Sequence, residues 1–489
     1  MKKKNLKVLF ITAELSPFAA VGGLAFVARS LPKALKNLGA DVRIVMPKYR
    51  IISAKKYGLK KIIKNIEVEF DGKKEKIDIW RGYLPQSEVP VYFIDNKRYF
   101  GKGKIYFTGN ASSDGTVSEF KRFGFFDKAV FEIFSALDWH PDILHCHDWH
   151  TGFIPLLRKQ LNGKNKKLAS MKTVFTIHNL AYQGWYKKSL IYKILDLEKG
   201  SFQAKKNWIS AMRQGILTAN VVNTVSKSYA KEILTKEFGC GMNEALKTRK
   251  KDLIGILNGL DVKRFNPSAD KNIKFRYSRK NFIKGKKENK IYLQKKLGLD
   301  ANSDIPLIGM VGRLAEQKGF DILIPILNDV AKAGAQVVIV GPGSKKYKDK
   351  IMKAAKKYRD RIVLSYGFSF ETAQMTYAAS DFLLVPSRFE PCGLVQMIAM
   401  LYGAVPIARA TGGLKDTVID YKMMDKKASN GFLFKKYESD ILLKTIKRAL
   451  KVYDNKKDFR QLQLNGMAED FSWNASAKKY LSLYEKLRG

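Results

Sequence analysis

The strongest constraint on the fold is a repeated alternation of short apolar runs with helical patterns. Runs at 7–12, 42–46 and 173–177 have the length of buried strands, and polar or glycine-containing loops connect them to helical patterns such as 24–38. A second series of the same kind begins at residue 307. Strands that alternate with helices are typical of parallel sheets covered on both faces. We therefore predict an α/β protein with two doubly wound, Rossmann-like domains that face each other across a cleft.

The division into two domains follows from these two series. Residues 1–256 are predicted to form the N-terminal domain and residues 257–470 the C-terminal domain, and a chain of 489 residues is long enough for both cores. The segment 266–296 is polar and rich in lysine, so we expect it to supply a hinge and a surface helix. Ligands of parallel sheets bind at the carboxyl ends of the strands, so the loops there should line the cleft.

The charge of the chain limits its partners. The formal net charge is +45, from 90 Lys and Arg against 45 Asp and Glu. The lysines are spread over several segments, which favours lysine-rich solvated faces over a dedicated polyanion site, the alternative explanation. We expect no specific nucleic acid partner, but a weak, salt-sensitive affinity for polyanions.

Cysteine usage and hydropathy indicate a cytoplasmic protein without a membrane partner. Cys146, Cys240 and Cys392 are odd in number and include no Cys-x-x-Cys pair, which argues against a disulfide framework. The apolar part near the N-terminus, 8–13, is too short for a signal peptide and fits a first strand. No apolar run approaches the roughly 20 residues of a membrane span. The oligomeric state is left open.

Paired glycines precede the first helical pattern of the chain. Gly22 and Gly23 stand between the first strand and the pattern 24–38. Because glycine has no side chain, such a loop lets backbone N–H groups approach a phosphate or a sugar. Tight packing of the helix is the alternative explanation.

The histidines cluster in one part of the chain. His145, His147 and His150 surround Asp148, but this Asp stands one place too early for the His-x-His-x-Asp-His pattern of dinuclear zinc hydrolases. Neighbours on a strand also point to opposite faces, so a single-metal site would need a bend. We therefore predict no metal site. The polar residues expected to line the cleft at these strand ends are Asp148, His178 and Asn179.

The second series contains a stretch, 387–394, that joins an apolar strand to a helical pattern starting near Leu394. It places Glu390, Cys392 and Gly393 at the mouth of a helix, whose free N–H groups attract an anion. An ordinary strand-to-helix turn with an incidental glutamate is the alternative.

Fixed cations stand on another loop of the same series. Arg313 and Lys318 follow the strand that begins at residue 307, and with glycines in the neighbouring loops they can hold a diphosphate. The chain has no Asp-x-Asp pair to present Mg²⁺ and no GxxxxGK[ST] loop. These residues indicate group transfer from a nucleotide-diphosphate donor, with cations stabilising the leaving group. Surface charges without a ligand are the alternative.

The motifs now assembled resemble those of bacterial glycogen synthases and plant starch synthases, which are glycosyltransferases with two Rossmann-like domains. The similar runs, in the same order along nearly the whole chain, are HDWHTGF (147–153), TIHNLAYQG (176–184), TVSKSYAKEI (224–233), NGLD (258–261), VGRLAEQKG (311–319), PSRFEPCGL (386–394) and TGGLKDTV (411–418). The stretch 471–489 is similar to the family's closing helix, which implies that it completes the N-terminal domain.

The resemblance implies transfer of glucose from ADP-glucose, or alternatively UDP-glucose, to the non-reducing end of an α-1,4-glucan such as glycogen or starch. It implies retention of configuration, no required metal and no other cofactor. Arg313 and Lys318 would bind the donor phosphates, and Glu390 would lie beside the donor glucose. His178 would contact that glucose, and Asp148 would lie on the acceptor side. The further substrate-binding residues implied are Gly22, Gly23, Asn179, Asn258, Phe368 (stacked on adenine), Cys392, Gly393, Leu394 and Thr411.

Three positions depart from the family pattern. Ala20 stands where the family has the lysine of Lys-x-Gly-Gly, Phe26 replaces an aspartate, and Ser118-Glu119 replaces Asp-Asn before Arg122-Phe123. A lost charge-assisted phosphate contact costs roughly 2–4 kcal/mol of transition-state stabilisation. A glucan-binding pseudo-enzyme and another retaining nucleotide-sugar glycosyltransferase of the same fold are therefore kept as alternatives.

Overall fold

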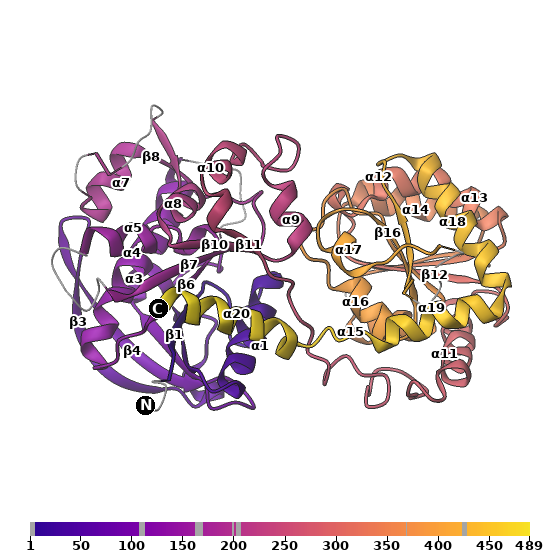
Figure 1. Ribbon diagram of the computed structural model, residues 1–489, viewed down its shortest axis with the longest axis horizontal. Helices are drawn as coiled ribbons and strands as arrows, with labels where there is room; N and C mark the ends of the chain where they lie inside the picture. Colours follow the sequence, from indigo (N-terminus) through magenta and orange to yellow (C-terminus); the bar gives the residue numbers. More distant parts are fainter. Residues whose placement is uncertain are drawn as a thin grey trace. The chain divides into compact units, whose positions relative to one another are not determined.

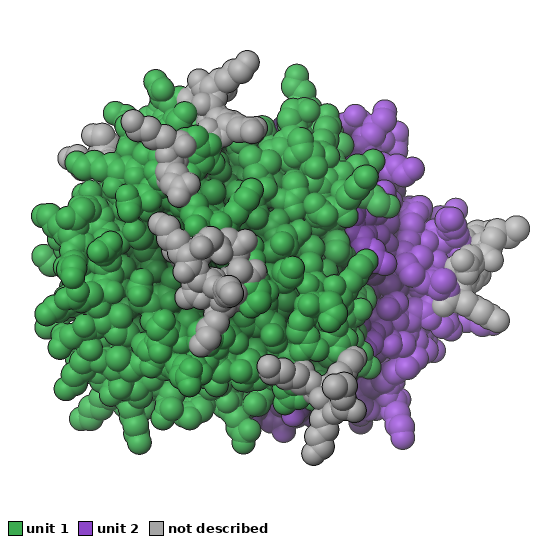
Figure 2. Space-filling view, turned by 60° about the vertical axis from the view of Figure 1, so that its left-hand side comes forward, with its two compact units in different colours: residues 1–225, 230–259, 473–489 green, residues 226–229, 260–472 purple. Residues whose placement is uncertain are grey.

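The chain forms two compact units. Unit 1 comprises residues 1–225, 230–259 and 473–489, and unit 2 comprises residues 226–229 and 260–472 (Figure 2). The computed structural model describes residues 5–106, 113–161, 170–197, 200–201, 207–367, 369–422 and 428–489, without the side chains of 113–118 and 161. The main division falls after Gly259, three residues beyond the boundary predicted after residue 256.

Unit 1 is built on a mainly parallel sheet, which has nine strands among the described residues (Figure 1). In sheet order they are β11 (Leu253–Gly255), β10 (Val221–Thr224), β7 (Lys172–Ile177), β6 (Ile143–His147), β1 (Lys7–Ile11), β2 (Asp41–Pro47), β5 (Pro90–Asp95), β4 (Lys73–Tyr83) and β3 (Lys60–Phe70). Among the described strands of this sheet, only β3 with β4 and β4 with β5 pair in antiparallel fashion. Strand β1 is buried at four of its five positions, which explains the continuous apolar run at 8–11.

The helices that accompany this sheet agree broadly with the sequence pattern. They are α1 (Gly23–Asn37), α2 (Ala54–Tyr57), α3 (Lys97–Phe100), α4 (Ser113–Ala136), α5 (Ile154–Leu161), α7 (Lys188–Leu195), α8 (Ala211–Thr218), α9 (Lys227–Glu232) and α10 (Asn243–Thr248), with the 3₁₀ turns η1 (Trp149–Thr151) and η2 (Lys250–Asp252). The strands β8 (Trp185–Lys187) and β9 (Trp208–Ser210) form a separate antiparallel ribbon. The helical pattern expected at 24–38 corresponds to α1, which begins one residue earlier, at Gly23.

The C-terminal helix α20 (Trp473–Arg488) belongs to unit 1, where it packs on α1 (Figure 1). Its polar contacts reach residues inside two strands of the sheet, β10 and β6. The Tyr480 hydroxyl accepts from the side-chain amide of Asn223 at 3.0 Å, and the Tyr484 hydroxyl lies 2.7 Å from Nδ1 of His145. The last helix of the chain therefore completes the core of the first unit.

Unit 2 has a six-stranded sheet that is parallel throughout its described strands. In sheet order these are β14 (Ile362–Tyr366), β13 (Gln336–Gly341), β12 (Leu307–Val311), β15 (Phe382–Val385), β16 (Val405–Arg409) and β17 (Phe432–Phe434). The accompanying helices are α11 (Phe282–Leu297), η3 (Glu316–Lys318), α12 (Phe320–Leu323), η4 (Ile324–Ile326), α13 (Leu327–Lys332), α14 (Lys345–Lys357), α15 (Phe370–Ala379), α16 (Val395–Leu401), α17 (Gly412–Thr417), α18 (Ser439–Asp454) and α19 (Lys456–Ala468). In the parts of the chain that the structure covers, no helix combines the length and hydropathy of a membrane span.

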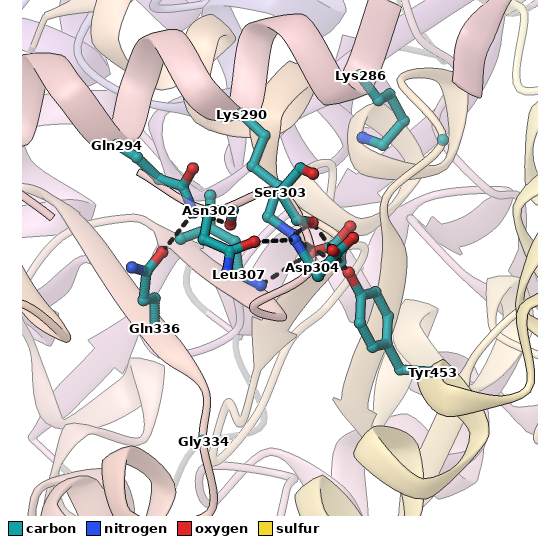
Figure 3. Close-up of polar contacts among 12 residues, drawn as sticks. Lys286, Lys290, Gln294, Asn302, Ser303, Asp304, Leu307, Gly334, Gln336 and Tyr453 are labelled. Atoms are coloured by element: carbon teal, nitrogen blue, oxygen red, sulfur yellow. Dashed lines mark hydrogen bonds and ion pairs between the residues drawn. The ribbon is translucent and has the colours of Figure 1, made fainter. Parts of the chain in front are cut away.

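The expected surface helix, α11, in fact buries one face of lysines and amides. The Lys290 ammonium lies 2.5 Å from Asp381, 2.8 Å from the carbonyl oxygen of Ser303 and 3.2 Å from the Tyr453 hydroxyl (Figure 3). Lys286 donates to the carbonyl oxygens of Ala378, in the last turn of α15, and of Tyr402, just after α16, both at 3.0 Å. Buried cations are tolerated only with such partners. The lysine-rich composition of α11 therefore predicted a surface helix, whereas one face of the helix is buried and polar.

Candidate functional site

A buried carboxylate holds the glycine loop that follows β1. Glu14 accepts hydrogen bonds from the backbone N–H groups of Val21 and Gly22, both at 2.7 Å, and from the Tyr106 hydroxyl at 2.6 Å. Helix α1 then begins at Gly23, with no acidic residue in its first turn. The exposed loop can thus present the first N–H groups of α1 to a ligand.

Asp148 and His178, which were both predicted to line the cleft at strand ends, lie together after β6 and β7. Oδ1 of Asp148 accepts the backbone N–H of His178 at 2.8 Å, and Asn179 donates a second backbone hydrogen bond to the same carboxylate. Burial is the larger influence and raises the pKa of Asp148 to about 7, while the two amide donors lower it and the Glu14 charge raises it. The carboxylate is therefore fixed by the loop that carries His178.

The histidine cluster is a hydrogen-bonded core rather than a set of converging ligands. Nδ1 of His147 lies 3.0 Å from Nε2 of His178, and Nε2 of His145 lies 2.6 Å from the Thr176 hydroxyl. Burial lowers the pKa of His145 and His147 well below the ordinary value and that of His178 to about 3, so the rings are neutral at physiological pH. Within the described parts of the chain, no three His, Cys, Asp or Glu side chains gather as metal ligands.

Two predicted asparagines occupy different environments in unit 1. Asn179 is partly exposed, and its Oδ1 accepts the backbone N–H of Ala181 at 3.1 Å. Asn258 is only 6% exposed, and its Oδ1 has no hydrogen-bond partner among the described residues. A buried acceptor without a partner is costly, so Asn258 is suited to a ligand that would supply the missing donor.

In unit 2 the predicted Glu390 and Lys318 form a single cluster. The Lys318 ammonium lies 2.6 Å from Oε2 of Glu390, and the Ser387 hydroxyl donates to the same oxygen at 2.9 Å. Glu390 is only 8% exposed and Lys318 is partly exposed, so the ammonium shields a carboxylate that is largely out of water. The pair lies on the loops after β12 and β15, where a parallel sheet binds its ligands.

The two neighbouring loops of unit 2 pack backbone against backbone. The N–H of Gly413 donates to the carbonyl oxygen of Glu390 at 3.1 Å. A methyl group on Gly412 would collide with that same carbonyl, and one on Gly413 would collide with the carbonyl of Cys392. The structure thus brings together the predicted residues of both loops: Glu390, Cys392, Gly393, Leu394 and Thr411.

The remaining predicted residues of unit 2 are not gathered as closely. Arg313 is exposed, and no ion pair links it to another described residue, so its guanidinium is available to an anion. Helix α16 begins at Val395, one residue after the predicted start, so the amides of Gly393 and Leu394 stand just before it. Phe368, predicted to stack on adenine, lies outside the described residues.

Sequence reasoning missed the residues that shape the glycine loop. Arg122 donates to the carbonyl oxygens of Tyr99, Lys102 and Lys104 at 2.9, 2.6 and 2.5 Å. It thereby fixes the loop that delivers Tyr106 to Glu14. The sequence signal that could have indicated these residues is Glu14, which follows an apolar strand closely. A charged side chain at such a position needs polar partners when it is buried.

Two family models match the chain. The starch synthase catalytic domain matches residues 7–248, and the glycosyl transferases group 1 model matches residues 293–463. Together they cover most of both units.

Curated proteins and solved structures are similar to the chain over its whole length. The glycogen synthase of Geotalea daltonii is 43% identical, covering 98% of both chains, and that of Moorella thermoacetica is 42% identical, covering 99% of this chain and 97% of its own. The catalytic domain of starch synthase IV from Arabidopsis thaliana, bound to ADP and acarbose, is 34% identical, with a TM-score of 0.87. The alignment covers 99% of this chain and 100% of the Arabidopsis domain.

Proposed function

Because the chain belongs to the glycogen and starch synthase family of glycosyltransferases, as its motifs predicted, we propose that it transfers glucose from ADP-glucose to an α-1,4-glucan. The acceptor would be the 4-hydroxyl at the non-reducing end, with retention of configuration. The observation that carries this proposal is the cluster of Lys318, Ser387 and Glu390, which lies beside amide-presenting loops. ADP in the starch synthase structure supports the adenine donor, with UDP-glucose as the alternative.

Unit 2 supplies the donor-side groups in this proposal. Arg313 and Lys318 would stabilise the charge that develops on the leaving diphosphate, and the amides of Gly393 and Leu394 would receive its oxygens. The bond between C1 and the phosphate oxygen breaks as the acceptor oxygen bonds to C1 on the same face. The acceptor proton passes to the leaving phosphate oxygen. Fixed protein charges fill the role of a divalent cation, so the proposal includes no metal and no other cofactor.

Unit 1 supplies the acceptor-side groups. Asp148 and Asn258 offer oxygen acceptors to sugar hydroxyls, and Asn258 has the unpaired Oδ1 that such a donor would satisfy. His178 is neutral, so it can donate or accept a hydrogen bond without repelling a positive charge at C1. The cytoplasmic location and the lack of a specific nucleic acid partner remain parts of this proposal.

The proposal is tested by ADP release from ADP-glucose in the presence of glycogen. Glu390→Ala should lower turnover by at least about 100-fold, because it leaves Lys318 unpaired and removes a charge beside the donor glucose. Glu371→Ala, an exposed glutamate of α15 whose partner is Lys296, is the matched control and should retain turnover. Equal turnover in Glu390→Ala and wild type would contradict the proposal.

The same assay separates the proposal from its alternatives. Ala20 is exposed in the glycine loop, so Ala20→Lys should raise kcat/KM for the donor by about tenfold or more if it restores a phosphate contact. A wild-type protein that binds glycogen but releases no nucleotide from either donor would be a pseudo-enzyme, and Ala20→Lys should then restore the release. Release with another sugar donor or acceptor only would identify a different glycosyltransferase.

A further inference from the structure

The ribbon of β8 and β9 separates a buried face from an aromatic outer face. Side chains alternate along each strand, and residues directly opposite one another share a face. Tyr186 pairs with Ile209, and both are buried, at 3% and 2% exposure. Lys187 pairs with Trp208 on the other face, which Trp185 also shares, and all three side chains are exposed.

The two tryptophans are diagonal neighbours on this outer face. Trp185 lies opposite Ser210, two residues along β9 from Trp208. Diagonal neighbours of an antiparallel pair are about 7–8 Å apart, within reach of aromatic side chains. Trp185 and Trp208 are 46% and 47% exposed, and Tyr182, on the loop that leads into β8, is 60% exposed. We refer to Tyr182, Trp185 and Trp208 as the aromatic patch.

The aromatic patch is joined rigidly to the candidate acceptor residues of unit 1. Tyr186 packs on Phe120, with ring centroids 4.6 Å apart. Gly184, at a φ of 59°, lies so close to Trp149 that an added methyl group would stand 2.5 Å from the indole ring. Trp149 directly follows Asp148, and Tyr182 stands four residues after His178. The ribbon is therefore a continuation of the loop that carries the predicted site.

We propose that the aromatic patch is a surface binding site for a chain of the α-glucan, separate from the residues that carry the reaction. This inference rests on the proposed function, which makes a glucan polymer the acceptor. Sugar rings have apolar faces edged by hydroxyl groups, and flat aromatic side chains offer a complementary apolar surface. Several exposed aromatic side chains in one place mark an interaction surface rather than ordinary surface variation.

A second binding site on the surface is useful to an enzyme whose acceptor is a polymer with many chain ends. A glucan held at the aromatic patch keeps its other chain ends at a raised local concentration, which increases avidity without a new contact at the reacting centre. A short oligosaccharide cannot use this effect. The patch should therefore affect the KM for glycogen while leaving the use of short acceptors unchanged.

The test is a Trp185→Ala/Trp208→Ala double variant, measured by affinity electrophoresis in gels with glycogen and by kinetics. We expect the variant to lose most of the glycogen-dependent retardation of wild type and to have a KM for glycogen about tenfold higher. Its kcat, its KM for ADP-glucose and its kinetics with maltotriose should equal those of wild type. Tyr83→Ala is the matched control, because Tyr83 is an aromatic residue of unit 1 that is 53% exposed on β4.

The outcomes distinguish this proposal from the proposed function. Retardation needs no turnover, so an inactive wild type whose retardation falls in the double variant would overturn the proposed function and support the patch. Unchanged retardation and an unchanged KM for glycogen in the double variant would overturn the patch. The double variant could instead retain glycogen binding and lose binding to phosphatidylglycerol vesicles, which would assign the surface to a membrane. If it retained glycogen binding and lost a dimer, the surface would be assigned to a second copy of the chain. Either result would also overturn the aromatic patch as a glucan site.

Discussion

Asp148 combines an unusual backbone with a buried charge. Its φ of 56° and ψ of −177° lie in a region that residues other than glycine rarely adopt, and such strain persists only where surrounding contacts impose it. Here the amides of His178 and Asn179 fix the carboxylate. Strained non-glycine residues often mark functional sites, which agrees with the acceptor-side role predicted for Asp148.

The buried Asp148 carboxyl predicts a pH-dependent gain in stability for Asp148→Asn. In the unfolded chain the carboxyl loses its proton near the ordinary pKa of 3.8, but in the folded protein it does so only at about pH 7. The folded state therefore binds more protons between these values, and the free energy of unfolding of wild type falls as pH rises through this window. Asp148→Asn has no such proton to lose, so its free energy of unfolding should not fall in this window. The difference in favour of the variant should therefore grow with pH to as much as about 4 kcal/mol above pH 7.

This difference can be measured by denaturant unfolding of both proteins from pH 4 to pH 8. Asp142→Asn, a change to an aspartate of unit 1 that is not deeply buried, serves as the control for a general charge effect. An advantage of Asp148→Asn that does not change across the pH range would show that the carboxyl of wild type is not held protonated by burial.

The loops after β15 and β16 act as one structural element. Gly412 has a φ of 46°, and the carbonyl oxygen of Glu390 accepts the N–H of Gly413. Because these backbones touch, the position of Glu390 depends on a loop about 20 residues further along the chain. Close backbone approach of this kind leaves no room for a side chain.

Gly413→Ala should therefore weaken binding of the donor as well as lower the stability of the fold. The new methyl group would collide with the carbonyl of Cys392 and push apart the loops that carry Glu390 and Thr411. We expect a loss of roughly 1–3 kcal/mol in unfolding free energy from overpacking. The KM for ADP-glucose should rise by tenfold or more, measured by ADP release. Lys415→Ala, an exposed residue of the same helix, should leave both values unchanged, and a normal KM in Gly413→Ala would contradict this account.

At the scale of the whole molecule, the last helix of the chain stabilises the first unit. The hydroxyl groups of Tyr480 and Tyr484 reach Asn223 and His145, and the Ser476 hydroxyl donates to the carbonyl oxygen of Leu257 at 2.6 Å. All these contacts are internal to unit 1. The core of unit 1 therefore requires both ends of the sequence.

Tyr484→Phe should destabilise unit 1 by about 1–3 kcal/mol, because it leaves the buried Nδ1 of His145 without its partner. The measurement is urea unfolding followed by tryptophan fluorescence. Tyr437→Phe also removes a tyrosine hydroxyl, but that hydroxyl belongs to unit 2 and contacts Asp321. The unit 1 transition should therefore shift only in Tyr484→Phe, and an unchanged transition would show that α20 contributes little through this contact.

The sequence by itself determined the two α/β units, the order of most strands and helices, and the family. These features depend on local periodicity and on short motifs, and both are encoded by neighbouring residues. It also singled out Glu390 and Lys318, which the structure joins at 2.6 Å, and Asp148 and His178, which share a hydrogen bond. The carboxyl ends of parallel strands meet at one edge of a sheet, so such residues were expected to lie close together.

Only the tertiary structure decided which residues hold the site in place. Glu14, Tyr106 and Arg122 are far apart in the sequence, and no local pattern links the first two through a hydrogen bond of 2.6 Å. The buried face of α11 was likewise invisible, because lysine is ordinarily a surface residue and only distant partners such as Asp381 make its burial tolerable. Local patterns fix secondary structure, whereas the partners of buried polar groups depend on long-range packing.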